Sequence, residues 1–182
     1  HLPGGWGERV IAHESQVFAV DDALSDNAAV LLEPLSIALH SVLRTPPEDQ
    51  EPVMVIGSGT IALSTIWALR ATGFRGSLLA QAKRDHERKL ARTLGASEVV
   101  APGPEARQAL IETGASAYMP VVGPEVFSGG GFAVVYDCVG SPSSLAQALR
   151  FASPRGRIVV IGCAGELKRL DLTFLWAREL QI

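Results

Sequence analysis

A glycine-containing segment, residues 53–62, constrains the fold of this chain more than any other stretch. It reads Val-Met-Val-Ile-Gly-Ser-Gly-Thr-Ile-Ala, an apolar β-branched run that leads into the pattern Gly-x-Gly-x-x-Ala. An apolar helical pattern follows at 60–72, and a second apolar run lies at 77–80. This order of strand, tight turn, helix and strand predicts a βαβ unit with two parallel strands.

The turn inside this unit has the composition of a dinucleotide site. Gly57 permits the sharp bend, Gly59 leaves room for a pyrophosphate beside the main chain, and Ala62 lets the helix pack closely on the strand. The N–H groups at the start of the helix then face the anion. The alternative is an ordinary βαβ crossover in which the glycines only serve the turn. Three further residues of the turn are expected along the pyrophosphate and nicotinamide side: Ser58, Thr60 and Ile61.

The rest of the chain continues the alternation of strands and helices. The further expected elements are a helix at 85–94, a strand at 98–101, a helix at 105–113, a loop at 114–131, a strand at 133–136, a helix at 143–152 and a strand at 157–161. This alternation predicts an α/β fold, a Rossmann-type doubly wound parallel sheet with helices on both faces. Ligands of such sheets bind at the carboxyl ends of the strands. Five residues at those ends are therefore candidates for cofactor binding: Cys138, Val139, Gly140, Ile161 and Gly162.

The N-terminal part of the chain has a weaker pattern. Two short strand-like runs lie at 10–12 and 17–20, and a helical pattern covers 28–43. Glu33-Pro34 falls inside this helical pattern. Because proline lacks an N–H group and restricts the residue before it, we expect a break or kink there.

Composition excludes several classes of function. The chain has 182 residues, of which 47% are hydrophobic and 19% charged, enough for one packed domain. A net charge of −3 leaves no basic field for nucleic acid, and no apolar run reaches the length of a membrane span. Cys138 and Cys163 are expected to be buried free thiols, which is typical of a reducing, cytoplasmic compartment. A start at His1 and a strand-like end at 181–182 predict a piece of a longer polypeptide.

Several motifs occur in an order and spacing typical of one protein family. They are residues 4–9 with 12–15, 28–35 with 38–40, the glycine turn, 94–96, 136–140, 156–162 and 171–180. With these motifs the chain resembles the medium-chain dehydrogenase/reductases of the zinc-dependent alcohol and polyol dehydrogenase type. The resemblance implies that residues 1–24 are the tail end of a catalytic, GroES-like domain. It implies that 25–182 are a linking helix and a dinucleotide-binding Rossmann domain, truncated at its C-terminus.

The resemblance also implies a role for Glu33. A glutamate at this Glu-Pro position faces the catalytic zinc in the polyol and threonine dehydrogenase branch, so Glu33 is a candidate catalytic residue and metal ligand. The alternative is a solvated or capping glutamate at a helix break. The family's other zinc ligands belong to a domain that these residues do not include. Zinc is therefore expected in the intact enzyme and not in this fragment, which is expected to show no turnover alone.

The end of the second strand bears on the choice between NADP and NAD. The resemblance aligns Ala82 with the position where NAD-binding members carry an acidic residue for the ribose 2′-hydroxyl, and Lys83 and Arg84 follow. A small residue followed by two cations suits a 2′-phosphate. This favours NADP(H), with NAD as the alternative. The competing interpretation is that Lys83 and Arg84 form a solvated first turn of a helix.

Taken as a whole, the resemblance implies a hydride transfer between an alcohol or polyol and NAD(P), assisted by zinc in the intact enzyme. It implies a small-molecule substrate, no nucleic-acid or membrane partner, and a homodimer or homotetramer. Two alternatives stay open: a zinc-free quinone or enoyl reductase of the same superfamily, and a non-catalytic NAD(P)-sensing module. An S-adenosylmethionine methyltransferase is disfavoured, because Ala82 stands where such a protein needs an acidic residue.

Overall fold

The computed structural model describes residues 7–163, 165–167 and 170–182. The chain divides into two compact units, with the division between Leu32 and Glu33. The predicted domain boundary at residues 24 and 25 lies eight residues earlier. Each unit is described by itself below.

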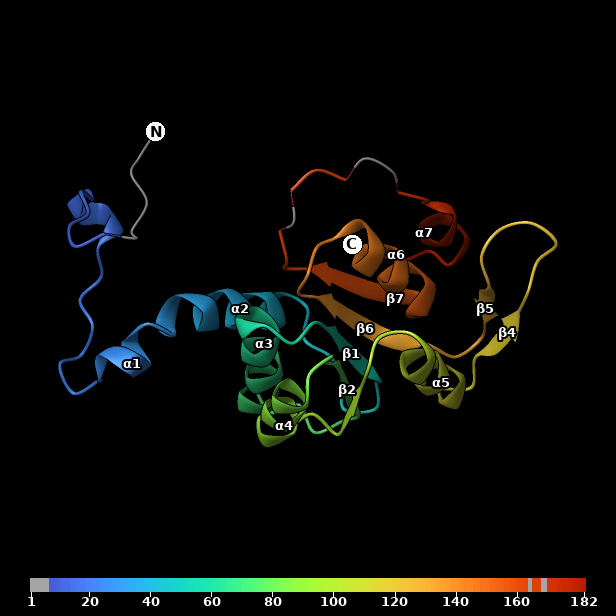
Figure 1. Cartoon of the computed structure of the whole chain (residues 1–182), viewed down its shortest axis with the longest axis horizontal. Coiled ribbons are helices and arrows are strands. Elements are labelled where there is room, and N and C mark those ends of the chain that lie inside the picture. The colour runs from blue at the N-terminus through green and yellow to red at the C-terminus, as the bar shows by residue number, and fades with distance from the viewer. Residues whose placement is uncertain (1–6, 164, 168–169) are drawn as a thin grey trace. The chain divides into compact units, whose positions relative to one another are not determined.

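The N-terminal unit has little regular structure. It contains a 3₁₀ turn, η1 (Glu14–Gln16), and one short helix, α1 (Asp26–Ala29) (Figure 1). The two strands predicted in this unit are absent, so that prediction was wrong. Ile11 and Phe18 are each 84% exposed, and the described residues of the unit include no strand. An apolar run of this length forms a strand only when another strand supplies its hydrogen bonds.

Helix α2 (Leu32–Arg44) follows α1 after a short interruption. Pro34 lies in the first turn of α2, where its missing N–H group would have no intrahelical partner. The predicted break is therefore present, but it precedes Glu33 instead of falling at Pro34. Ala38 and Val42 are the fully buried residues of α2 and belong to the core of the second unit.

A five-stranded parallel sheet forms the centre of the second unit. Its strands lie in the order β3-β2-β1-β6-β7. Their bounds are β1 Val53–Ile56, β2 Leu78–Gln81, β3 Glu98–Val100, β6 Phe132–Asp137 and β7 Ala152–Val160. Val53 pairs with Leu78 on one side and with Val134 on the other. The chain thus runs outward from β1 to β3 and returns to the opposite side of β1, which confirms the predicted doubly wound, Rossmann-type sheet.

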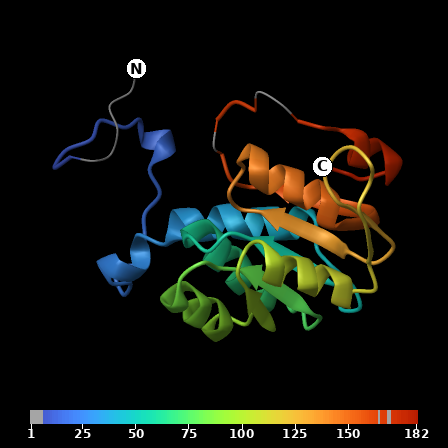
Figure 2. The ribbon, with the colours of Figure 1, turned by 45° about the vertical axis from the view of Figure 1, so that its right-hand side comes forward.

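Helices cover both faces of this sheet (Figures 1 and 2). One hydrophobic cluster joins the sheet to α2, α3 (Thr60–Ala71) and α4 (Asp85–Thr93). The other joins it to α5 (Pro104–Glu112), α6 (Pro142–Phe151) and α7 (Thr173–Ala177). Val53 and Val55 of β1 belong to the first cluster, and Met54 and Ile56 to the second. Because successive side chains of a strand point to opposite faces, a continuous apolar run is what a doubly covered strand requires.

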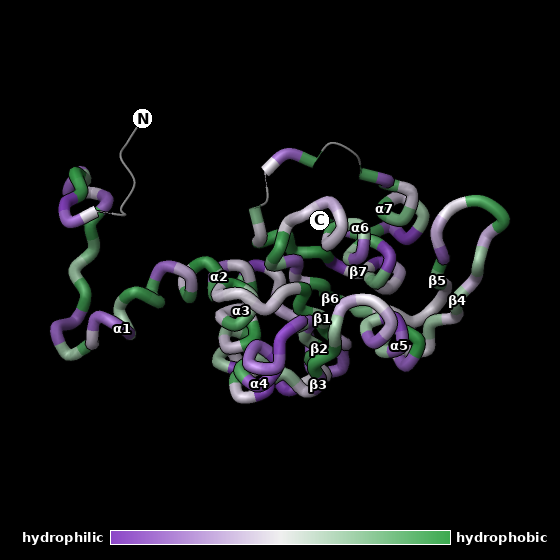
Figure 3. Tube along the Cα trace, in the orientation of Figure 1, coloured by the Kyte–Doolittle hydropathy of each residue, from purple (hydrophilic) through white to green (hydrophobic). Residues whose placement is uncertain are grey.

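The segment predicted as a loop, 114–131, contains a hairpin. Strands β4 (Ser116–Tyr118) and β5 (Val126–Ser128) pair in antiparallel fashion as a separate two-stranded sheet. Phe127 is buried and its ring meets that of Phe151 edge-to-face, with centroids 5.7 Å apart. Part of the connection between the strands is hydrophobic (Figure 3), and Val121 and Val122 in it are exposed. The loop prediction was wrong because the anchoring contact is made with α6, far away in the sequence.

Two further observations concern the end of the chain and membranes. Gln181 forms a parallel bridge with Arg157 of β7, beyond the outer strand of the sheet. The strand-like end predicted at 181–182 therefore does contact the sheet edge. Within the part of the chain that the structure describes, no helix combines the length and the apolar character needed to cross a membrane.

Candidate functional site

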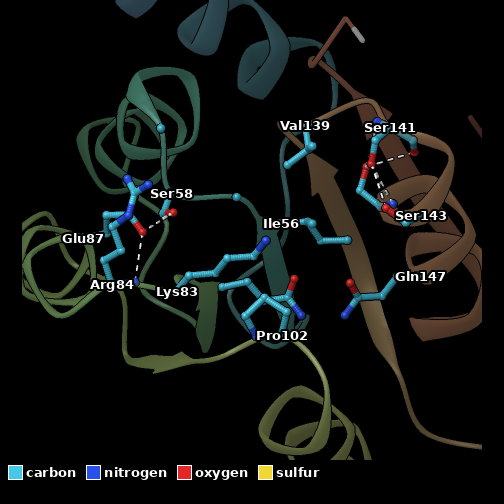
Figure 4. A pocket seen from close by; sticks show the side chains of 14 residues that line it. Ile56, Ser58, Lys83, Arg84, Glu87, Pro102, Val139, Ser141, Ser143 and Gln147 are labelled. Carbon is cyan, nitrogen blue, oxygen red and sulfur yellow. Dashed lines mark hydrogen bonds and ion pairs between the residues drawn. The ribbon is translucent and has the colours of Figure 1, made fainter. Parts of the chain in front are cut away.

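A cavity of about 480 Å³ lies where the strands of the main sheet end (Figure 4). Its walls come from the turn after β1, the ends of β2 and β3, the turn after β6, and the start of α6. Strands β2 and β6 flank β1 on opposite sides, so the cavity lies at the point where the strand order reverses. Ligands of open α/β sheets bind in this crevice.

The glycine turn forms one wall of the cavity. Gly57 has φ +118°, a conformation that side chains other than glycine rarely adopt. Gly59 is the N-cap of α3 in an extended conformation, and a Cβ atom placed on it would meet nothing within 4 Å. Leu63 N donates to Gly59 O at 3.0 Å as the first bond of the helix, so the preceding N–H groups have no intrahelical acceptor. An anion can therefore approach these groups, and the turn fits a diphosphate.

Of the turn residues predicted to bind cofactor, only some face the cavity. Gly57, Ser58 and Gly59 line it, whereas Thr60 and Ile61 stand in the first turn of α3 and are not among the lining residues. Cofactor binding by Thr60 and Ile61 stays a prediction.

Glu87 of α4 contacts the glycine turn, a feature that sequence reasoning missed. Its Oε2 atom accepts hydrogen bonds from Ser58 Oγ at 2.9 Å and from Arg84 N at 3.1 Å. Its Oε1 atom lies 3.3 Å from Arg84 Nη1. The Ser58 bond is the main cause of a lowered pKa of Glu87. The sequence carries a signal for the bond to Arg84 N: Glu87 stands at the third position of α4, where an acidic residue commonly accepts a hydrogen bond from the N-cap main chain.

The residues predicted at the ribose divide into two groups. Lys83 and Arg84 line the cavity, and Figure 4 shows the Lys83 side chain extending across it. Ala82 does not line the cavity, because its side chain is 1% exposed and packs in the core with α2, α3 and α4. Arg84 is partly neutralised by Glu87. Lys83 has no carboxylate within ion-pair distance among the residues the structure describes.

The turn after β6 is held by a buried carboxylate. Asp137 is fully buried, and its Oδ1 atom accepts from Val139 N and Gly140 N, each at 3.0 Å. Its Oδ2 atom accepts from Ser144 Oγ at 3.0 Å. Among the residues predicted to bind cofactor here, Val139 lines the cavity and Gly140 does not. Asp137 thereby fixes the position of Val139.

Gly140 and Gly162 allow two turns of the main chain to approach each other closely. A Cβ atom on Gly140 would overlap the Gly162 carbonyl, and one on Gly162 would overlap the main chain of Val139. Gly162 and Ile161 both lie outside the cavity lining. These two glycines keep the ends of β6 and β7 together beside the cavity.

The two cysteines differ in environment. Cys138 is partly buried, packs against the core, and lies 3.5 Å from Thr65 Oγ1. Burial raises its pKa to about 12, so the thiol is protonated at neutral pH. Cys163 is exposed, and the prediction of a buried thiol was wrong for it. Its position explains this, since β7 ends at Val160 and Cys163 lies beyond the sheet.

The far wall of the cavity was not predicted at all. It consists of Gln81, Pro102 and four residues near the start of α6: Ser141, Ser143, Ser144 and Gln147. Ser141 caps α6 by accepting from Ser144 N at 3.1 Å. The Ser-Pro-Ser-Ser sequence carries that capping signal. Nothing local to Gln81 or Pro102 shows that the fold brings them to the same wall.

Glu33 lies apart from this cavity. It is exposed in the first turn of α2 and is not among the residues that line the cavity. The described residues contain no group of three or more His, Cys, Asp or Glu side chains placed to hold a metal ion. Protein zinc sites use three or four protein ligands, so Glu33 alone does not fit a zinc site. Its role as a metal ligand stays a prediction.

Comparisons with known proteins identify the family. A family model described as zinc-binding dehydrogenase matches residues 60–182. L-idonate 5-dehydrogenase of Vitis vinifera is 28% identical over 179 residues, which cover 98% of this chain and 46% of the relative. The chain spans about half the length, or less, of the curated relatives it matches.

Solved structures share the fold. The alcohol dehydrogenase RspB of Escherichia coli CFT073, complexed with NADH, has a TM-score of 0.73 and 23% identity over 91% of this chain and 45% of its own. A zinc-binding dehydrogenase target of Sinorhizobium meliloti, bound to NADP, has a TM-score of 0.62 and 27% identity over 81% of this chain and 41% of its own. The family model covers well over half of the sequence, and the sheet order and the cavity agree with it. The chain therefore belongs to the zinc-binding dehydrogenase family.

Proposed function

We propose that this chain is the cofactor-binding domain of an alcohol or polyol dehydrogenase and that it holds NADP(H). One observation carries the proposal: the open space above Gly59 at the start of α3 belongs to the same cavity as Lys83 and Arg84. Free N–H groups at a helix start suit a diphosphate, and two cations beside them suit a further phosphate.

The chain's own residues would hold the cofactor along the cavity. The main chain from Gly57 to Ile61 accommodates the diphosphate, and Lys83 and Arg84 face the 2′-phosphate. Val139, fixed by Asp137, forms part of the wall on the nicotinamide side. Gly140 and Gly162 allow the close approach of the two turns next to Val139, and cofactor contacts by Cys138, Gly140, Ile161 and Gly162 stay a prediction. When bound, the nicotinamide ring would supply the acceptor or donor of the hydride.

The choice of NADP over NAD follows from charge. Lys83 forms no ion pair with a carboxylate of the described residues. The buried Ala82 offers no acceptor to a ribose 2′-hydroxyl. Glu87 opposes this preference, since it lines the cavity and binds Arg84. Among the described residues of this wall, Lys83 and Arg84 carry two positive charges and Glu87 carries one negative charge. The wall therefore has a net positive charge.

The substrate and the metal belong to the proposal for the intact enzyme. Hydride transfer with an alcohol or polyol, and zinc assistance with Glu33 as one ligand, are supported by the family to which the chain belongs. Because a single exposed carboxylate does not fix a metal, residues outside those described would have to complete such a site.

Titration with NADPH and NADH separately, by fluorescence or calorimetry, tests the cofactor assignment. We expect NADPH to bind at least about tenfold more tightly, which corresponds to about 1.4 kcal/mol. Lys83→Ala should remove most of this preference by weakening NADPH alone, and Lys89→Ala on the exposed side of α4 is a matched control. A preference for NADH would defeat the phosphate argument, and binding of neither dinucleotide would defeat the proposal itself.

A further inference from the structure

Gln81 has a buried amide without a protein partner. It is the last residue of β2, its side chain is only 3% exposed, and it lines the cavity described above. Its Nε2 atom is buried and has no hydrogen-bond partner within the part of the chain that the structure describes. Buried polar groups are nearly always hydrogen-bonded in folded proteins. An amide left unmatched on the wall of a cavity therefore indicates that a ligand supplies the partner.

The position of Gln81 identifies which part of a dinucleotide it would meet. The glycine turn takes the diphosphate, and Lys83 and Arg84 take the adjacent ribose. Gln81 shares the remaining wall with Pro102 and Gln147. Figure 4 shows Gln147 directed from α6 into the cavity, on the side where Pro102 lies. Under the proposed function, on which this inference rests, the group that reaches this wall is the base.

We infer that Gln81 selects adenine as the base of the bound cofactor. A glutamine amide presents one donor and one acceptor side by side. The edge of adenine presents the complementary pair, the N6 amino group as donor and a ring nitrogen as acceptor, and glutamine commonly binds adenine through these two atoms. The ring nitrogen in this pairing is N7, so the contact is made with the edge of adenine that carries N6 and N7. Gln81 is thus a residue that determines base specificity.

A cofactor with hypoxanthine in place of adenine distinguishes base recognition by the Gln81 amide from a role in which Gln81 only fills space. Hypoxanthine has nearly the shape of adenine but carries an oxygen acceptor at position 6 in place of the amino donor. On the edge that carries N7, hypoxanthine presents two acceptors, its oxygen and N7, where adenine offers a donor and an acceptor. Because the two bases have almost the same shape, a difference in affinity reports hydrogen bonding by the amide.

The test compares NADPH with its analogue in which hypoxanthine replaces adenine, titrated calorimetrically against the whole chain. The unmodified chain should bind NADPH about tenfold more tightly than the analogue, as expected for one well-formed amide–base pair. Gln81→Leu removes both polar groups at similar volume. It should weaken NADPH by about tenfold, leave the analogue within about threefold, and bring the ratio of the two affinities close to one. Gln108→Leu, on the exposed side of α5 and outside this cavity, should change neither affinity.

Thermal unfolding without ligand separates a binding role from a structural one. Because Gln81→Leu removes a buried unmatched amide, the variant should unfold at or above the temperature of the unmodified chain. Equal affinity of the unmodified chain for the two dinucleotides overturns the inference whether or not the variant folds. A variant that retains the tenfold discrimination overturns it too. If the unmodified chain binds neither dinucleotide, the proposed function fails together with this inference; binding without discrimination defeats the inference alone.

Discussion

Gly57 and Gly59 stand two residues apart and have different roles in the same turn. Gly57 is required by the backbone: its φ is +118°, and a Cβ atom there would lie 3.1 Å from Val139 Cγ2. Gly59 has an ordinary extended conformation and empty space where a side chain would go. The fold therefore needs the first glycine, and the proposed ligand needs the second.

This difference predicts opposite effects of two single substitutions. Gly57→Ala should lower the free energy of unfolding by about 1–3 kcal/mol, because alanine is strained at positive φ. Gly59→Asn should leave stability unchanged or slightly raised, since asparagine is a better N-cap than glycine. The same Gly59→Asn change should weaken NADPH binding at least about tenfold by filling the space above α3. Urea unfolding and calorimetric titration of both variants measure the two quantities. Unchanged NADPH affinity in Gly59→Asn would contradict the placement of the diphosphate.

At the scale of elements, the contact between Glu87 and Ser58 joins the turn after β1 to the start of α4. The Glu87 carboxylate accepts a bond from Ser58 Oγ at 2.9 Å and one from Arg84 N at 3.1 Å. Both bonds favour the charged carboxylate, and its pKa is lowered, chiefly by the Ser58 bond. The contact therefore holds two walls of the cavity together more strongly while Glu87 is ionised.

The sign of the resulting pH dependence follows from the lowered pKa. A carboxylate with a lower pKa in the folded state contributes stability above its ordinary pKa of 4.5, and this contribution disappears as the pH falls through the lowered value. Glu87→Gln should therefore reduce stability at pH 7 and make little difference at pH 3. The difference in urea midpoint between the two chains, measured from pH 7 down to pH 3, should shrink below about pH 4.5. A constant difference over this range would show that ionisation of Glu87 does not matter to the contact.

Elements were predictable from the sequence where their pattern is local. The strand at 53–56 and the helix that follows it carry apolar patterns, and the structure confirms both elements. The hairpin within 114–131 was missed because Phe127 gains its burial from Phe151, which a local pattern does not reveal. Strands at 10–12 and 17–20 were expected from composition alone, yet those residues have no strand to pair with among the described residues.

The candidate site shows the same division. The glycine turn, Lys83 and Arg84 were predicted because short runs of consecutive residues indicate their chemistry, and they line the cavity. Gln81 was missed because it reads as part of an apolar strand, and its significance depends on having no partner in the fold. The residues of α6 that line the cavity come from a helix more than 80 residues after the glycine turn, and only the sheet order brings them to it.

At the scale of the whole molecule, the described residues assemble a cofactor cavity without the donor set of a zinc site. The cavity is lined by the main sheet, α4 and α6, whereas Glu33 is exposed on α2. No group of three or more potential metal-binding side chains is placed together within residues 7–163, 165–167 and 170–182. We therefore expect binding of the cofactor and activation of an alcohol to be separable in this chain.

This separation predicts binding without turnover. NADPH at about 100 times its dissociation constant should stabilise the chain by about 2.7 kcal/mol, which raises the unfolding temperature by roughly 5–10 °C for a domain of this size. In a parallel solution that holds the oxidised cofactor NADP⁺, zinc and a panel of alcohols and polyols, no absorbance of reduced cofactor should develop, because one exposed carboxylate does not hold zinc in place. Gly59→Asn is the control for the thermal shift: tenfold weaker binding leaves about 1.4 kcal/mol of stabilisation at the same NADPH concentration, so the shift should fall to about half or less. Steady turnover by this chain would show that its own residues complete the catalytic site. Absence of any thermal shift would instead show that the cavity is not a dinucleotide site, since a ligand that binds only the folded state must raise the unfolding temperature.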